Sequence, residues 1–92
     1  MNSNEKEITL TIQNEIGIHM RPASAIVETL GPFDAEVSFE KDGTRVNAKS
    51  IMGILTLAAG KGTILRAFAS GPQADDALAA VAKLVNDKFG ED

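Results

Sequence analysis

The sequence predicts an α+β domain in two layers, with a four-stranded, mostly antiparallel sheet covered on one face by three helices. Segments with apolar residues at every second position alternate with segments whose apolar residues recur every third or fourth position. The resulting order is β-α-β-β-α-β-α. An Asp-Gly pair between the second and third strands predicts a tight hairpin. These observations favour antiparallel pairing with the helices gathered on one side.

The first half of the chain is predicted to hold two strands and one long helix. Residues 7–13 alternate, with apolar side chains at 8, 10 and 12, as in a half-buried strand. After a loop over 14–18, an apolar stripe predicts a helix over about 20–30, which Gly31-Pro32 ends. Alternation returns over 35–40, the second strand.

The second half begins at the hairpin turn Lys41-Asp42-Gly43 and a short strand over 44–47. A short helix is predicted over 50–57 with Ser50 as its N-cap, followed by a flexible connection over 58–62 and a strand over 63–69. Gly71-Pro72 opens the last helix, and Gly90 is placed to cap it. Its expected buried stripe is Ala74, Leu78, Val81, Val85 and Phe89.

Composition predicts one domain over residues 1–92 and excludes several classes of protein. The net charge is −4 and the aromatic residues are 4 Phe, so no basic stripe or stacking platform for nucleic acid is visible. With no cysteine, disulfides and thiolate metal sites are excluded. No apolar run approaches the ~20 residues of a membrane span, so we expect a cytoplasmic protein without membrane insertion.

The only histidine, His19, stands just before the first predicted helix and two residues from Arg21. Free backbone N–H groups make a helix N-terminus an anion site, an Arg fork binds phosphate, and histidine forms covalent intermediates. Together these parts suggest an imidazole that carries a phosphoryl group. The alternatives are ordinary: a lone histidine is often a surface or satisfied core residue, Gly17 can simply end the strand, and Pro22 suits any first helical turn.

Other reactive constellations are poorly supported. Gly60-Lys61-Gly62-Thr63 is not a phosphate-binding loop of the GxxxxGK[ST] type, because position 55 is leucine and Gly62 separates the lysine from the threonine. One histidine and scattered carboxylates predict no metal site and no cofactor. A hydrolytic triad with Ser24 lacks an obvious orienting acid.

The segment from Lys49 to Leu55 is the second notable feature. Ser50 at a helix N-cap needs no further explanation than capping. The apolar residues Ile51, Met52 and Leu55 cannot all face the same core as Ile54, so some should be exposed near the first helix and form a docking surface. A fully buried short helix is the alternative.

Two segments of the chain resemble the histidine-containing phosphocarrier (HPr) family of the phosphoenolpyruvate-dependent phosphotransferase system. They are Gly17-Ile18-His19-Met20-Arg21-Pro22-Ala23, similar to the family's active-site motif, and Asn47-Ala48-Lys49-Ser50-Ile51-Met52-Gly53-Ile54-Leu55, similar to its regulatory-serine motif. The resemblance extends over essentially the whole chain. It implies an open-faced β-sandwich, in which a four-stranded antiparallel sheet has three helices on one side.

The resemblance also implies a function and site residues. His19 would accept a phosphoryl group on Nδ1 from phosphorylated enzyme I and pass it to sugar-permease IIA domains or regulatory targets, and Arg21 would stabilise the phosphate. Ser50 would be the site of an HPr kinase/phosphorylase. The partner-binding residues would be Met20, Ile51, Met52 and Leu55. Such a protein is a stoichiometric carrier more than an enzyme and is expected to be a monomer; transcriptional regulators are further candidate partners.

Met20 departs from the family pattern, which more often has Ala or Thr at this position. Because methionine adapts to varied surfaces, this change bears on partner specificity more than on chemistry. Two other readings stay open. One is a purely regulatory HPr-like binding protein that signals through Ser50, although retention of His19 and Arg21 argues against it. The other is an unrelated small α+β domain with a chance histidine.

Overall fold

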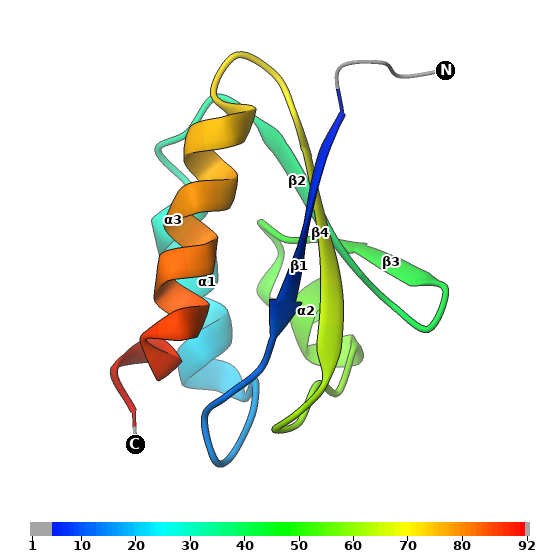
Figure 1. Ribbon diagram of the computed structural model, residues 1–92, viewed down its shortest axis with the longest axis vertical. Coiled ribbons are helices and arrows are strands. Elements are labelled where there is room, and N and C mark those ends of the chain that lie inside the picture. Colours follow the sequence, from blue (N-terminus) through cyan, green and yellow to red (C-terminus); the bar gives the residue numbers. More distant parts are fainter. Residues whose placement is uncertain (1–4, 92) are drawn as a thin grey trace.

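The computed structural model describes residues 5–91 (Figure 1). Its elements follow the predicted order β-α-β-β-α-β-α and end in a short 3-10 turn. They are β1 (Lys6–Thr11), α1 (Met20–Leu30), β2 (Glu36–Lys41), β3 (Thr44–Asn47), α2 (Ile51–Thr56), β4 (Ile64–Ser70), α3 (Ala74–Asn86) and η1 (Lys88–Gly90). The predicted bounds of the elements from β1 to β4 agree with these or differ by one or two residues. The last helix was predicted to open at Gly71-Pro72, but α3 begins at Ala74 with Gln73 as its N-cap.

The sheet has the strand order β1-β4-β2-β3, and every neighbouring pair is antiparallel. The strand that comes last in sequence, β4, therefore lies between β1 and β2 (Figure 1). Because β4 is antiparallel to both, β1 and β2 run in the same direction without touching. The connection through α1 thus passes over β4, and the connection through α2 passes over β2, so no two parallel strands are paired.

The predicted fold class is confirmed: all three helices cover one face of the sheet (Figure 1). Packing of α1 against α2 and α3, and of α3 against β1 and β4, encloses one hydrophobic core. Its largest fully buried apolar side chains come from the sheet side (Ile12, Phe39, Leu65) and from the helices (Ile26, Leu30, Ile54, Val81, Val85). No helix within residues 5–91 is long and apolar enough to cross a membrane.

The hairpin between β2 and β3 has the predicted turn. Lys41 pairs with Thr44, so the loop consists of Asp42 and Gly43 alone. Their φ angles are +51° and +86°. A two-residue turn with positive φ at both positions matches the right-handed twist of the strands, and Asp-Gly is a preferred sequence for it.

The predicted end of the last helix was wrong. The apolar stripe suggested a helix through Phe89 with Gly90 as its cap, but α3 ends at Asn86 with Asp87 as its C-cap. Lys88 and Phe89 both have φ of +56°, which is left-handed backbone. Phe89 is still buried, because the turn η1 brings its ring back onto the core. The same turn reverses the chain, so that Glu91 comes back toward the start of α1.

Candidate functional site

The loop between β1 and α1 is fixed to the loop that precedes β4. Ile12 exchanges backbone hydrogen bonds with this loop, donating to the Thr63 carbonyl at 2.9 Å and accepting from the Gly62 N–H at 2.7 Å. Farther along, the Ile18 N–H donates to the Ala59 carbonyl at 2.8 Å. These hydrogen bonds hold both ends of the loop, at Ile12 and Ile18, and so determine where the chain enters α1.

Gly17 is required at its position for two reasons. Its φ is +83°, a conformation that side chains with a Cβ rarely adopt. A Cβ there would also lie 2.6 Å from the Ala59 carbonyl oxygen and 2.6 Å from the Gly60 Cα. Gly17 therefore does more than end a strand, since β1 already ends at Thr11. It lets the loop approach residues 59–60 closely, two residues before His19.

His19 is the N-cap of α1, as predicted. Its backbone is extended, and its carbonyl accepts the first helical hydrogen bond from the Ala23 N–H at 3.0 Å. Its side chain does not cap the helix. Pro22, the third helical residue, has no N–H to satisfy. Within residues 5–91, the N–H groups of Met20 and Arg21 have no hydrogen-bond acceptor, so two backbone donors remain at this helix end.

The side chains of His19 and Arg21 converge on one carboxylate, that of Glu91. The Oε2 atom of Glu91 lies 3.0 Å from His19 Nε2, 3.2 Å from Arg21 Nε and 3.1 Å from Arg21 Nη2. The other oxygen, Oε1, accepts from Asn14 Nδ2 at 2.9 Å. The Glu91 side chain is only 12% exposed, whereas those of His19 and Arg21 are 39% and 68% exposed. A chain segment near residue 91 thus completes a site that begins at residue 14.

Asn14 is the fully buried member of this group. Besides Glu91, its Nδ2 donates to the Gly17 carbonyl at 2.7 Å, so one amide joins the loop to the end of the chain. Its Oδ1 has no hydrogen-bond partner within the described residues. Both amide hydrogens of Asn14 are therefore engaged, one by the Gly17 carbonyl and one by Glu91.

The pKa of the Glu91 carboxyl is lowered from its ordinary 4.5. Partial burial acts to raise this pKa, but the hydrogen bonds from Asn14 and His19, and the positive charges of His19 when protonated and of Arg21, outweigh it. Glu91 is therefore a carboxylate at neutral pH. A hollow beside it is lined by Glu15, Ile16, His19, Arg21, Gly90 and Glu91.

Asn14 and Glu91 were missed by sequence reasoning. Asn14 looked like an ordinary loop residue after a strand, and Glu91 lies beyond the last periodic segment. Its only sequence signal is an acidic residue after a glycine, which is too common to select. The carboxylate that contacts His19 belongs to Glu91, the residue directly after the turn η1.

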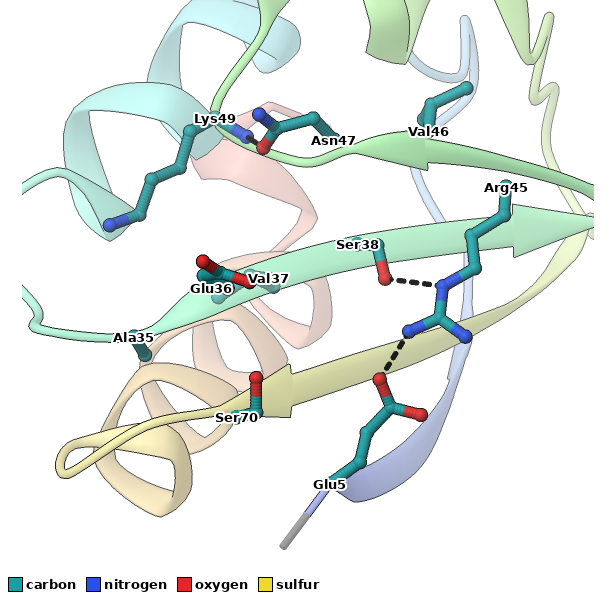
Figure 2. Close-up of a pocket in the computed structure, with 10 residues that line it drawn as sticks. All are labelled: Glu5, Ala35, Glu36, Val37, Ser38, Arg45, Val46, Asn47, Lys49 and Ser70. Carbon is teal, nitrogen blue, oxygen red and sulfur yellow. Dashed lines mark hydrogen bonds and ion pairs between the residues drawn. The ribbon is translucent and has the colours of Figure 1, made fainter. Parts of the chain in front are cut away.

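A second hollow lies away from His19, between β2, β3 and the end of β4 (Figure 2). Its main cation, Arg45, donates from Nε to Ser38 Oγ at 2.7 Å and forms an ion pair with Glu5. The Arg45 guanidinium also stacks 4.0 Å from the centre of the Phe68 ring on the uncovered face of the sheet. Lys49, the other cation that lines this hollow, donates to the Phe33 carbonyl at 3.0 Å.

Within residues 5–91 there is no cluster of three or more His, Cys, Asp or Glu side chains that could hold a metal ion.

The family comparison agrees with this geometry. A family model described as "PTS HPr component phosphorylation site" matches residues 6–87. The chain belongs to the HPr family. It is 42% identical over 84 residues to the phosphocarrier protein HPr of Treponema pallidum, covering 91% of this chain and 96% of that protein. It is 44% identical over 85 residues to the phosphocarrier protein NPr of Escherichia coli K12, covering 91% and 94%.

Solved structures support the same assignment. The HPr-C-His crystal structure from Thermoanaerobacter tengcongensis matches with a TM-score of 0.90 and 41% identity, covering 95% of this chain and 98% of that one. This chain is accordingly an HPr-family phosphocarrier of the phosphotransferase system, a carrier and not an enzyme.

The segment that resembles the family's regulatory-serine motif leads into α2. Ser50 is the N-cap of α2, as predicted, and its Oγ accepts from the Gly53 N–H at 3.1 Å. Met52 is 70% exposed and Met20, on α1, is 56% exposed. Ile51 and Leu55 are partly buried against the core, so the four residues expected to form a docking surface differ in how much they offer to a partner. Ile16, in the loop before His19, is a further large exposed apolar residue that the sequence had not singled out.

Proposed function

We propose that His19 accepts a phosphoryl group on Nδ1 from phosphorylated enzyme I and passes it to IIA domains or to regulatory targets. The observation that carries this proposal is that His19 is the N-cap residue of α1, two residues from Arg21, and that its side chain makes no capping hydrogen bond to the helix. The only nitrogen of its ring engaged within residues 5–91 is Nε2, so Nδ1 makes no competing hydrogen bond there.

A phosphoryl group bound to His19 would meet donors from both backbone and side chain. The Met20 and Arg21 N–H groups and the positive end of the α1 dipole favour a dianion at this place. The Arg21 side chain is 68% exposed, so its guanidinium has room to turn from Glu91 toward a phosphoryl oxygen. Phosphoryl transfer depends mainly on positioning and electrostatic stabilisation, and the partner proteins bring the remaining groups.

The docking surface for these partners is formed by Met20, Ile51, Met52 and Leu55 around the contact between α1 and α2. Exposed methionines suit a surface that must fit several partners in turn, because the thioether side chain is flexible and polarisable. We expect Met52→Ala to weaken enzyme I binding more than the matched variant Ile64→Ala. Ile64 is also an exposed apolar residue but begins β4, opposite Thr11 on β1. Equal affinities for the two variants, measured by calorimetry, would argue against this surface.

Ser50 is proposed as a regulatory phosphorylation site for an HPr kinase/phosphorylase. A phosphate there adds about −1.5 to −2 charge at the edge of the docking surface. If enzyme I presents acidic groups to that surface, docking is repelled and phosphorylation of His19 slows. Enzyme I affinity and transfer rates equal to wild type, both in Ser50→Asp and in authentic phosphoserine protein, would leave Ser50 with a capping role only.

The decisive experiment is incubation with enzyme I and phosphoenolpyruvate, followed by mass spectrometry of the intact protein. Wild type and Ser50→Ala should each take up one equivalent of acid-labile phosphate, because phosphohistidine is labile to acid and phosphoserine is not. His19→Ala should take up none while keeping the wild-type circular dichroism spectrum. A full acid-labile equivalent on His19→Ala would disprove the proposal.

The monomeric state expected for this carrier is measured in the same samples. Three solved relatives, an HPr from Thermoanaerobacter tengcongensis and two structures of Crh, are described as dimers. Light scattering of the phosphorylated and unphosphorylated protein should give the mass of one chain.

A further inference from the structure

We propose that Glu91 is a positioning residue for phosphoryl transfer: its carboxylate holds the hydrogen of His19 on Nε2 and thereby leaves the Nδ1 lone pair as the nucleophile. The proposal rests on the proposed function of His19 and deepens it. It assigns a role to a residue outside the matched family segment, which ends at residue 87.

The first step of the argument is the direction of one hydrogen bond. His19 Nε2 lies 3.0 Å from Glu91 Oε2. A carboxylate only accepts hydrogen bonds, so the hydrogen between these atoms belongs to Nε2. In a neutral imidazole the other nitrogen then has a lone pair and no hydrogen. The contact with Glu91 thus selects the tautomer in which Nδ1 can attack phosphorus.

The second step is that Glu91 is held in place from the protein side. Asn14 is fully buried and donates to Oε1 at 2.9 Å while it is anchored to the Gly17 carbonyl at 2.7 Å. Arg21 binds the other oxygen from outside. With 12% of its side chain exposed, Glu91 is less exposed than either His19 or Arg21. A carboxylate fixed in this way orients the imidazole ring as well as its hydrogen.

The third step is the charge that develops during transfer. As the Nδ1 lone pair forms the new N–P bond, the bond from phosphorus to the donor protein's leaving atom breaks and its electron pair stays with the donor. The hydrogen on Nε2 does not move, so positive charge builds up on the ring. Glu91 lies next to that charge and stabilises it, as a carboxylate stabilises an imidazolium in hydrolase triads.

The test compares Glu91→Ala and Glu91→Gln with the matched control Glu15→Ala. Glu15 lines the same hollow and carries the same charge, but it pairs with Lys61 at 3.2 Å and does not contact His19. Rapid-quench kinetics with phosphorylated enzyme I give the rate, and ¹⁵N NMR of the unphosphorylated proteins, at a pH where the ring is neutral, gives the tautomer. The final amount of acid-labile phosphate on wild type tests the carrier function separately.

We expect wild-type His19 to have its hydrogen on Nε2. In Glu91→Ala the ¹⁵N shifts of the two ring nitrogens should move toward each other, and phosphorylation should slow about tenfold. Glu91→Gln, which can still accept through its amide oxygen, should lie between the two, and Glu15→Ala should match wild type.

Three results would overturn the proposal. One is a hydrogen on Nδ1 in the wild-type protein. Another is a phosphorylation rate of Glu91→Ala that equals or exceeds the wild-type rate. A faster rate would mean that the carboxylate merely occupies the place of the phosphate. The third is a slower Glu91→Ala whose ring shifts remain those of wild type, because Glu91 would then act without fixing the tautomer.

Discussion

Replacing Gly17 by alanine tests how the loop positions His19. Two penalties are expected from the structure. Alanine at a φ of +83° must adopt a left-handed backbone conformation, which costs about 1–2 kcal/mol of stability. The new Cβ would also lie 2.6 Å from two backbone atoms of residues 59 and 60, so backbone must move, and such overpacking costs about 1–3 kcal/mol. The free energy of unfolding should therefore fall by about 2–5 kcal/mol.

Gly43→Ala is the matched control, because it separates the two penalties. Gly43 has a φ of +86°, but nothing lies within 4 Å of the Cβ that alanine would add there. Its loss should be the conformational part alone, about 1–2 kcal/mol. The difference between the two variants then measures the contact of Gly17 with Ala59 and Gly60.

Urea unfolding followed by circular dichroism, with thermal melting as a second measurement, gives both free energies. For a domain of this size each kcal/mol lowers Tm by about 4–8 °C. Gly17→Ala should also slow phosphorylation of His19, because the displaced loop leads directly through Ile18 to His19. Gly43→Ala should leave the phosphorylation rate unchanged. Equal losses of stability in the two variants, or a normal phosphorylation rate in a destabilised Gly17→Ala, would refute the reasoning.

Three further predictions concern charges and caps. Arg21→Ala should slow phosphoryl transfer about tenfold without removing the acceptor, and unchanged quench-flow kinetics would contradict a role in phosphate stabilisation. Ser50→Ala should lose about 1 kcal/mol of stability through the lost bond to the Gly53 N–H, while Ser50→Asp keeps a capping oxygen and should melt near wild type; a normal melting temperature in Ser50→Ala would remove the capping role. Stability should fall as the pH is lowered below about 4.5, because hydrogen bonding to Arg66 lowers the pKa of Glu7 and the pKa of Glu91 is lowered as well. The stability that such carboxylates contribute is present above their unfolded pKa and is lost as the pH falls through their folded pKa. Unfolding midpoints that stay constant down to about pH 3 would contradict this prediction.

The sequence by itself determined the elements of this protein and the start of its site. The strands β1, β2 and β4 alternate with a period of two and the longer helices with a period near 3.6, signals that need only neighbouring residues. The hairpin turn at Asp42-Gly43, the Ser50 cap and the place of His19 at the start of α1 were predictable for the same reason. Each depends on the chemistry of a few consecutive residues.

The tertiary structure alone decided which distant segments meet. The insertion of β4 between β1 and β2 follows from how the helices pack over the sheet, and no local pattern encodes it. A left-handed turn at Lys88 and Phe89 follows α3, and it brings Glu91 to His19, Arg21 and Asn14. The acid that faces the imidazole comes from 72 residues farther along the chain. Periodicity and capping rules describe contacts within a few residues, so contacts across such a separation are set by the packed core and not by the local sequence.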